Sequence, residues 1–170
     1  MNLGQSLLTI GALTLLSVIV LTVNRNNLNT ETILHESKFG ILAVSLGTSI
    51  LEEANGKAFD LATADSADSN ISHLTSPASL GPAPGEHYPN FNDLDDFNGF
   101  ETTIKTLPSA EYNISAKVYY VDPFTTGPDK KVNYRTWHKK INVYVTSPSM
   151  NNERDTVKLS SIFSYWYFIQ

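Results

Sequence analysis

Three acidic residues, Asp93, Asp95 and Asp96, stand close together beside Asn92 and Asn98. Carboxylate and amide oxygens are the ligands that calcium prefers. The spacing does not match the EF-hand loop, which needs a Glu at a fixed offset. Asp and Asn also form turns whose side chains stay in solvent, and we prefer that interpretation here. A calcium site at these three aspartates is therefore the alternative hypothesis.

Other residue types capable of chemistry are scattered. The histidines are His35, His73, His87 and His138, and no two of them are placed one helical turn apart. The chain has no cysteine, so disulfides and thiolate chemistry are excluded. No phosphate-binding glycine loop and no nucleophile elbow occurs in the sequence. We expect neither an enzyme nor a bound cofactor.

Two further features concern the surface of the protein. Asn70 and Asn113 each begin an Asn-Ile-Ser triplet, which matches the short acceptor sequence for N-glycosylation. The formal net charge is -5, and no block of lysine and arginine occurs. Because nothing in this pattern attracts a polyphosphate backbone, we expect no nucleic-acid partner.

The first structural element of the chain is an uncharged segment at the N-terminus. From Leu7 to Val23 the residues are almost all aliphatic or small, and Arg25 is the first charged residue. A helix needs about 20 such residues to cross a bilayer. Three interpretations are open: a cleaved signal, a permanent anchor, or a helix that leaves the membrane to pack against copies of itself. A signal is disfavoured because no basic residue precedes the apolar run.

Residues 25–56 are predicted to continue this helix, with a soft region at Asn24–Asn29 and a stop at Asn55-Gly56. No charge occurs between Phe39 and Leu51. A helix that is apolar on two sides is buried on two sides, so we expect one side on the protein's own sheet and the other against another subunit. One stripe at helical spacing comprises Leu28, Phe39, Leu42, Leu46, Ile50 and Ala54, and a second comprises Ile33, Val44 and Leu51.

The rest of the chain divides into a polar loop at 57–108 and a region of alternating polarity at 109–170. Three strands are predicted there, with turn signals from Pro123 to Asp129, and a short fourth strand is predicted around Glu101–Thr106. The predicted fold is α+β: a long N-terminal helix on an antiparallel sheet of three to four strands. Residues 1–24 form the membrane or core segment, and 30–108 join the sheet in one globular head.

The order of these elements resembles the type IV pilin-like family of pilins and pseudopilins. The stretches that carry the resemblance are "GQSLLTIGALTLLSVIV", "DLDDFNGF", "KKINVYVTSP" and "DTVKLSSIFSYW". The resemblance implies insertion in the inner membrane, removal of a leader by a prepilin peptidase, methylation of the new terminus and assembly into a surface filament. A pseudopilin or minor pilin, and a monomeric membrane-anchored binding module, are the alternatives.

The resemblance also assigns residues to the filament. Met1 is a candidate for the methylated terminus, and Gln5 then occupies the fifth position, where pilins usually carry a glutamate. If cleavage follows Gly4 instead, the fifth residue is Thr9. Phe39, Leu42, Leu46, Ile50 and Leu51 are assigned to packing on the sheet or on another subunit. The residues assigned to the filament core are Gln5, Leu7, Leu8, Ile10, Leu13, Leu15, Leu16, Val18, Ile19 and Val20.

Overall fold

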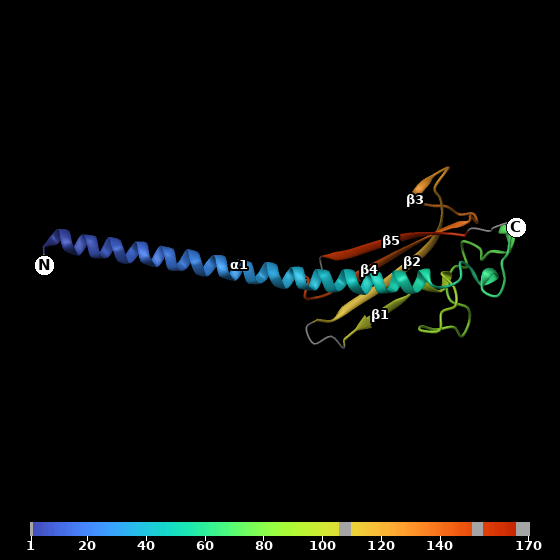
Figure 1. Ribbon diagram of the computed structural model, residues 1–170, viewed down its shortest axis with the longest axis horizontal. Coiled ribbons are helices and arrows are strands. Elements are labelled where there is room, and N and C mark those ends of the chain that lie inside the picture. The colour runs from blue at the N-terminus through green and yellow to red at the C-terminus, as the bar shows by residue number, and fades with distance from the viewer. Residues whose placement is uncertain (1, 106–109, 151–154, 166–170) are drawn as a thin grey trace. The chain divides into compact units, whose positions relative to one another are not determined.

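The protein begins with one long helix, α1, which runs from Leu3 to Asn55 (Figure 1). The computed structural model describes residues 2–105, 110–150 and 155–165. The residues of the predicted soft region, Asn24–Asn29, are helical, so α1 is continuous through them. The predicted stop is confirmed: the helix ends at Asn55, and the backbone N–H of Gly56 donates to the carbonyl of Glu52 at 3.1 Å.

Two compact units divide the chain, Met1–Lys38 and Phe39–Gln170. The first contains only the N-terminal part of α1 among the described residues. The second, which we call the head, contains the remainder of α1 and the whole sheet. The head therefore begins at Phe39, whereas the sequence placed its start at residue 30.

The sheet of the head is antiparallel and has five strands. The order is β1-β2-β4-β5, and β3 pairs with β2 outside this path. The strands are β1 (Glu101–Ile104), β2 (Tyr112–Asp122), β3 (Gly127–Lys131), β4 (His138–Thr146) and β5 (Thr156–Ser164). The α+β fold and the short strand after residue 100 are confirmed. The sequence missed β3, which forms where only a turn was predicted, because its Gly-Pro-Asp start reads as a turn.

The C-terminal part of α1 crosses one face of this sheet, with β2 and β4 beneath it (Figure 1). Ile50 and Ala54 are buried, and Phe39, Leu42, Leu46 and Leu51 are partly buried against the same core. In β2 the buried residues from Tyr112 to Tyr120 alternate with less buried ones, whereas residues 139–143 of β4 are all buried. The core residues from the sheet include Ile114, Ala116, Val118, Ile141, Val143 and Val145.

The helix lies close to the sheet at Gly47. A Cβ atom at this position would lie 2.7 Å from Leu159 Cδ1 and 3.3 Å from Val145 Cγ2. Ala43, one turn earlier, is fully buried on the same side of the helix. The predicted stripe of large residues thus flanks a line of small ones that lets the helix lie close to the strands. Leu28 falls in the first unit and is exposed.

The segment between α1 and β1 is mostly irregular and carries three short 3₁₀ turns. They are η1 (Leu61–Thr63), η2 (Ile71–His73) and η3 (Asp95–Phe97). Asp60 caps η1, and its side chain accepts a hydrogen bond from the backbone of Ala62 at 3.1 Å. Leu94 and Phe97 anchor η3 in the core. The predicted polar loop therefore has its own buried contacts and forms part of the head.

Candidate functional site

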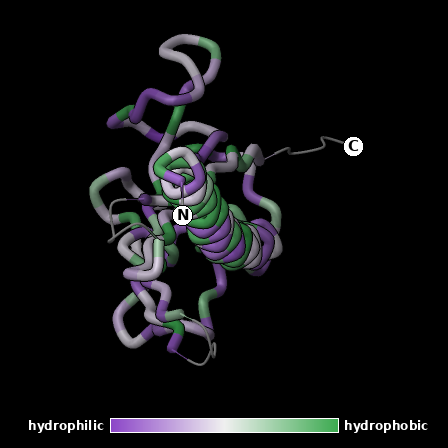
Figure 2. Tube along the Cα trace, turned by 90° about the vertical axis from the view of Figure 1, so that its left-hand side faces the viewer, coloured by the Kyte–Doolittle hydropathy of each residue, from purple (hydrophilic) through white to green (hydrophobic). Residues whose placement is uncertain are grey.

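The N-terminal unit presents an apolar surface that the chain itself leaves uncovered. Leu7, Leu13 and Ile19 have 64%, 62% and 50% of their surface exposed. Figure 2 shows green hydrophobic stretches alternating with purple hydrophilic ones along α1. Its most apolar 18-residue window has a mean hydropathy of 2.3, so the helix is long and apolar enough to cross a membrane. By length and composition it fits a membrane anchor or a signal sequence.

Small residues shape one side of this segment. Gly11 and Ala12 lie among Leu8, Leu15, Leu16 and Ile19, and together these six residues line an open apolar groove. Nothing lies within 4 Å of where a Cβ atom of Gly11 would be. Such a notch allows the backbone of a second helix to approach closely.

The predicted core residues from Gln5 to Val20 are all exposed in the single chain. Ser and Thr side chains of the segment donate to backbone carbonyls one turn earlier, as Thr9 does to Gln5 and Ser17 does to Leu13. Their hydroxyl groups are therefore satisfied without water, which suits an apolar environment. Met1, the candidate methylated terminus, lies outside the described residues.

The acidic residues of the loop are not solvated, and that part of the preferred interpretation is wrong. Asp93, Asp95 and Asp96 have only 3%, 2% and 2% of their surface exposed. Asp93 accepts a hydrogen bond from the backbone N–H of Asp95 at 2.7 Å, and Asp96 accepts one from Asn92 at 2.9 Å. Their predicted turn-forming role is therefore present. Among the residues described, no group of three or more acidic or histidine side chains is placed to hold one metal ion.

A lysine that the sequence analysis overlooked lies at the centre of this acidic region. Lys139 has no exposed surface, and its Nζ lies 2.6 Å from Asp60 Oδ2 and 2.6 Å from Asp95 Oδ1. The same Nζ donates to the carbonyl of Phe59 at 2.9 Å. Tyr120 adds a hydrogen bond from its hydroxyl to Asp60 Oδ2 at 3.3 Å. We call Asp60, Asp95, Lys139 and Tyr120 the buried polar cluster.

The carboxyl groups of this region have different proton affinities. Burial raises the pKa of Asp95 to about 7, although the charge of Lys139 opposes the shift. Burial and the neighbouring charge of Asp96 raise the pKa of Asp93 to about 6. Burial by itself would also raise the pKa of Asp60. The charge and hydrogen bond of Lys139 outweigh this effect, so the pKa of Asp60 lies below its ordinary value. Asp60 is thus the main anionic partner of Lys139.

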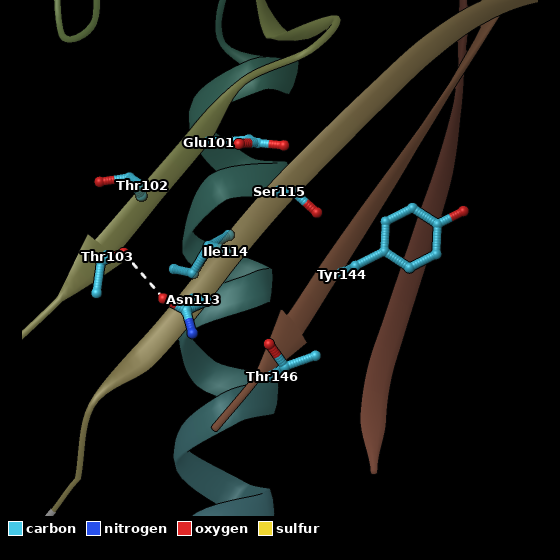
Figure 3. Close-up of a pocket in the computed structure, with 8 residues that line it drawn as sticks. All are labelled: Glu101, Thr102, Thr103, Asn113, Ile114, Ser115, Tyr144 and Thr146. Atoms are coloured by element: carbon cyan, nitrogen blue, oxygen red, sulfur yellow. Dashed lines mark hydrogen bonds between the residues drawn. The ribbon is translucent and has the colours of Figure 1, made fainter. Parts of the chain in front are cut away.

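The outer face of the sheet carries a shallow polar groove of about 490 Å³ where β1, β2 and β4 lie side by side (Figure 3). Glu101, Thr103, Asn113, Ser115, Tyr144 and Thr146 line it. Thr103 donates a hydrogen bond to Asn113 across the β1–β2 pair at 2.8 Å, drawn as a dashed line in Figure 3. This groove presents hydroxyl, amide and carboxylate groups around one aromatic ring. No motif in the sequence indicated it.

The two predicted glycosylation positions lie in different settings. Asn70 caps η2, where its side chain accepts from the backbone of Ser72 at 3.0 Å, whereas Asn113 is exposed in β2 beside the polar groove. The scattered histidines do not gather into one site. His73 pairs with Asp68 at 2.7 Å, and His138 contacts Ser164 at 2.8 Å.

Comparisons with protein-family models, with curated proteins and with solved structures give no match for this chain. The structure alone therefore defines the class of protein: it has an α+β head whose helix continues into an uncharged segment that is long and apolar enough to span a membrane.

Proposed function

We propose that this protein is a structural subunit of a type IV pilus-like filament, which polymerises through the N-terminal part of α1 and displays the head. The observation that carries the proposal is the exposed apolar surface of residues 3–24. This surface requires lipid before assembly and a protein core afterwards. A helix satisfies its own backbone hydrogen bonds, so it can pass from one apolar environment to the other.

The outward side of α1 within the head supports the same proposal. Ile41 is 70% exposed and Val44 is 45% exposed, and Ser45, Thr48 and Ser49 are the other outward residues of this stretch. No charge interrupts it between Phe39 and Leu51. The outward side of a helix in a monomeric protein is ordinarily charged. An uncharged side that is partly aliphatic suits contact with a neighbouring subunit.

The proposal includes the steps that the resemblance implies. The chain would enter the inner membrane, lose a leader to a prepilin peptidase, and be methylated at its new amino terminus. Assembly machinery would then add it to an extracellular filament made of copies of itself. Gln5 would replace the usual glutamate and offer a neighbouring terminus a hydrogen-bond acceptor without a charge.

A second candidate, a membrane-anchored binding module, is favoured by the polar groove on the outer sheet face. In that case α1 would only tether the head, and the groove around Asn113 and Tyr144 would contact a ligand. The two candidates differ in whether the protein polymerises.

Electron microscopy of material sheared from cells that make the protein separates them. The filament proposal predicts long fibres in which antibodies to the head label the whole length. Label only at fibre tips would instead indicate a minor pilin. Recovery of the chain only from membranes would contradict the filament proposal and support the tethered module.

A further inference from the structure

The ion pairs of Lys139 are closed off from solvent. The side chains of Lys139, Asp60 and Asp95 have 0%, 1% and 2% of their surface exposed. The Nζ atom also lies 4.4 Å from the centre of the Phe59 ring and 5.1 Å from that of Tyr120. An amine and two carboxyl groups are therefore in contact within a largely aromatic enclosure.

The two aspartates of this enclosure differ in their hydrogen bonds. Asp60 accepts from the backbone N–H of Thr75 at 3.0 Å and from that of Ala62 at 3.1 Å, whereas neither oxygen of Asp95 receives a hydrogen bond from the residues that the structure describes. Hydrogen-bond donors stabilise a carboxylate, and burial without them favours the neutral acid. The lowered pKa of Asp60 and the pKa of about 7 for Asp95 agree with this difference. Lys139 thus lies between one carboxylate and one carboxyl group that is readily protonated.

This arrangement meets the requirements for condensation of an amine with a carboxylic acid. The amine must lose a proton, and Asp60 is the base in contact with it. The acid must be neutral and close, and Asp95 Oδ1 lies 2.6 Å from Nζ. Groups held in contact react as though at an effective concentration of about 10⁵–10⁸ M. Exclusion of solvent favours the product further, because water is released in the reaction.

We propose that Lys139 and Asp95 become joined by an amide bond between Nζ and Cγ after the head has folded. Asp60 accepts a proton from the ammonium group, and the nitrogen lone pair then forms a bond to Cγ of protonated Asp95. Asp60 returns its proton to the hydroxyl group that leaves Cγ as water, and then accepts a second proton from the nitrogen. One ammonium, one carboxylic acid and one carboxylate thereby give one amide, one water molecule and protonated Asp60.

The bond would attach the loop before β1 covalently to the centre of the sheet. It closes the part of the chain between residues 95 and 139 into a ring, and such a constraint on the unfolded chain stabilises the folded one. It would serve a tethered head and a filament subunit alike. The pKa of Asp95 describes the chain before linkage, since the amide does not titrate in this range.

A neighbouring ion pair in the same strand provides an internal control. Lys140 pairs with Asp129, and the Asp129 side chain is 86% exposed. Its pKa is lowered, chiefly by a hydrogen bond from Lys140, so it stays a solvated carboxylate, which amines do not attack. We expect no amide bond between Lys140 and Asp129.

Mass spectrometry of the full chain, purified in detergent and then denatured and digested with trypsin, tests the proposal. Trypsin cleaves after lysine and arginine, so Asp60 and Asp95 fall in the peptide 58–105. Linkage blocks cleavage after Lys139. The expected product is a branched peptide that joins residues 58–105 to residues 136–140, with a mass lower than their sum by one water molecule. Fragmentation should place the branch at Asp95.

Two variants separate the role of Asp60 from the presence of an ion pair alone. Asp60→Asn removes the proton acceptor, and the branched peptide should be absent from it. Asp129→Asn removes a carboxylate from the exposed pair and should yield as much branched peptide as the wild type. Circular dichroism identifies the variants that fold, and the wild-type digest decides by itself if Asp60→Asn does not. Absence of the branched peptide from the folded wild type, a branch at Asp60, or full linkage in folded Asp60→Asn would overturn the proposal.

Discussion

Lys139 is the residue whose position most constrains the head. The alternation of β4 places it on the inward face together with Ile141, Val143 and Val145, where a charge needs a partner. Asp60 and Asp95 come from two separate parts of the loop between α1 and β1 and meet at its Nζ. The ion pairs therefore attach this long loop to the centre of the sheet.

Replacement of Lys139 by methionine should destabilise the head strongly. The substitution keeps the volume but leaves Asp60 and Asp95 buried without their cation, at a cost of about 3–5 kcal/mol in the free energy of unfolding. Lys117→Met is the matched control, because Lys117 is exposed on the outer face of β2, and it should change stability by less than about 0.5 kcal/mol. Denaturant unfolding of both variants measures the difference. Equal stability of the two would contradict the central role of Lys139.

The stability of the head should decrease as the pH rises from about 4 to about 7. In the folded state the pKa is about 6 for Asp93 and about 7 for Asp95, against an ordinary value of 3.8. Between these values the folded state holds protons that the unfolded chain has released, so the free energy of unfolding falls with rising pH. Asp60, with its lowered pKa, contributes the opposite trend at lower pH.

Thermal melting of the wild type and of Asp93→Asn across this range checks the pH dependence. The variant lacks one titrating group, so its melting temperature should vary less with pH than that of the wild type. A wild-type melting temperature that rises steadily from pH 4 to pH 7 would contradict the assigned protonation states.

At the scale of elements, the contact between α1 and the sheet depends on the absence of a side chain at Gly47. Gly47→Ala should destabilise the head by about 1–3 kcal/mol, since the new methyl group would overlap Leu159 and crowd Val145. Gly40→Ala in the same helix has nothing within 4 Å of its Cβ and should instead stabilise the protein by about 0.5–1 kcal/mol through helix propensity. Melting temperatures that shift in the same direction for both would show that the close approach is unimportant.

The elements predictable from sequence were those with strong periodicity. The uncharged helix and the three longer strands follow from patterns of period 3.6 and 2, and the end of the helix at Asn55 follows from the Asn55-Gly56 stop signal. The strand β3 could not be predicted, because its five residues are mostly polar and its pairing with β2 depends on a hairpin formed in the folded state. The helix continues through Asn24–Asn29 because the low helix propensity of asparagine is a small local effect. Helix formation is cooperative, and long helical stretches of α1 flank these residues on both sides.

The candidate sites were less predictable than the elements. A lysine on the inward face of β4 indicates that acidic partners must lie near it. The prediction that Asp93, Asp95 and Asp96 are solvated did not take this lysine into account. Which acids meet Lys139 depends on the path of the irregular loop, for which no periodic pattern exists. The polar groove around Asn113 and Tyr144 likewise arises from pairing across three strands and leaves no local motif.

At the scale of the whole molecule, the two units have different proposed tasks. The head is stabilised by its own apolar core and by the buried polar cluster, whereas the described residues of the N-terminal unit include no buried large apolar side chain. That surface gives the protein its proposed ability to move from a membrane into a filament. The central claim is that contacts between copies of this helix hold the filament together.

The most direct test of this claim is the yield of sheared filaments from cells that make Leu13→Asp. An aspartate at Leu13 would place an unpaired carboxylate in a dry helix core, which costs several kcal/mol. We predict that filaments disappear in Leu13→Asp and persist in Ser66→Asp, which adds the same charge to an exposed loop of the head. Filaments at wild-type yield from Leu13→Asp, with the chain present in them, would contradict the account.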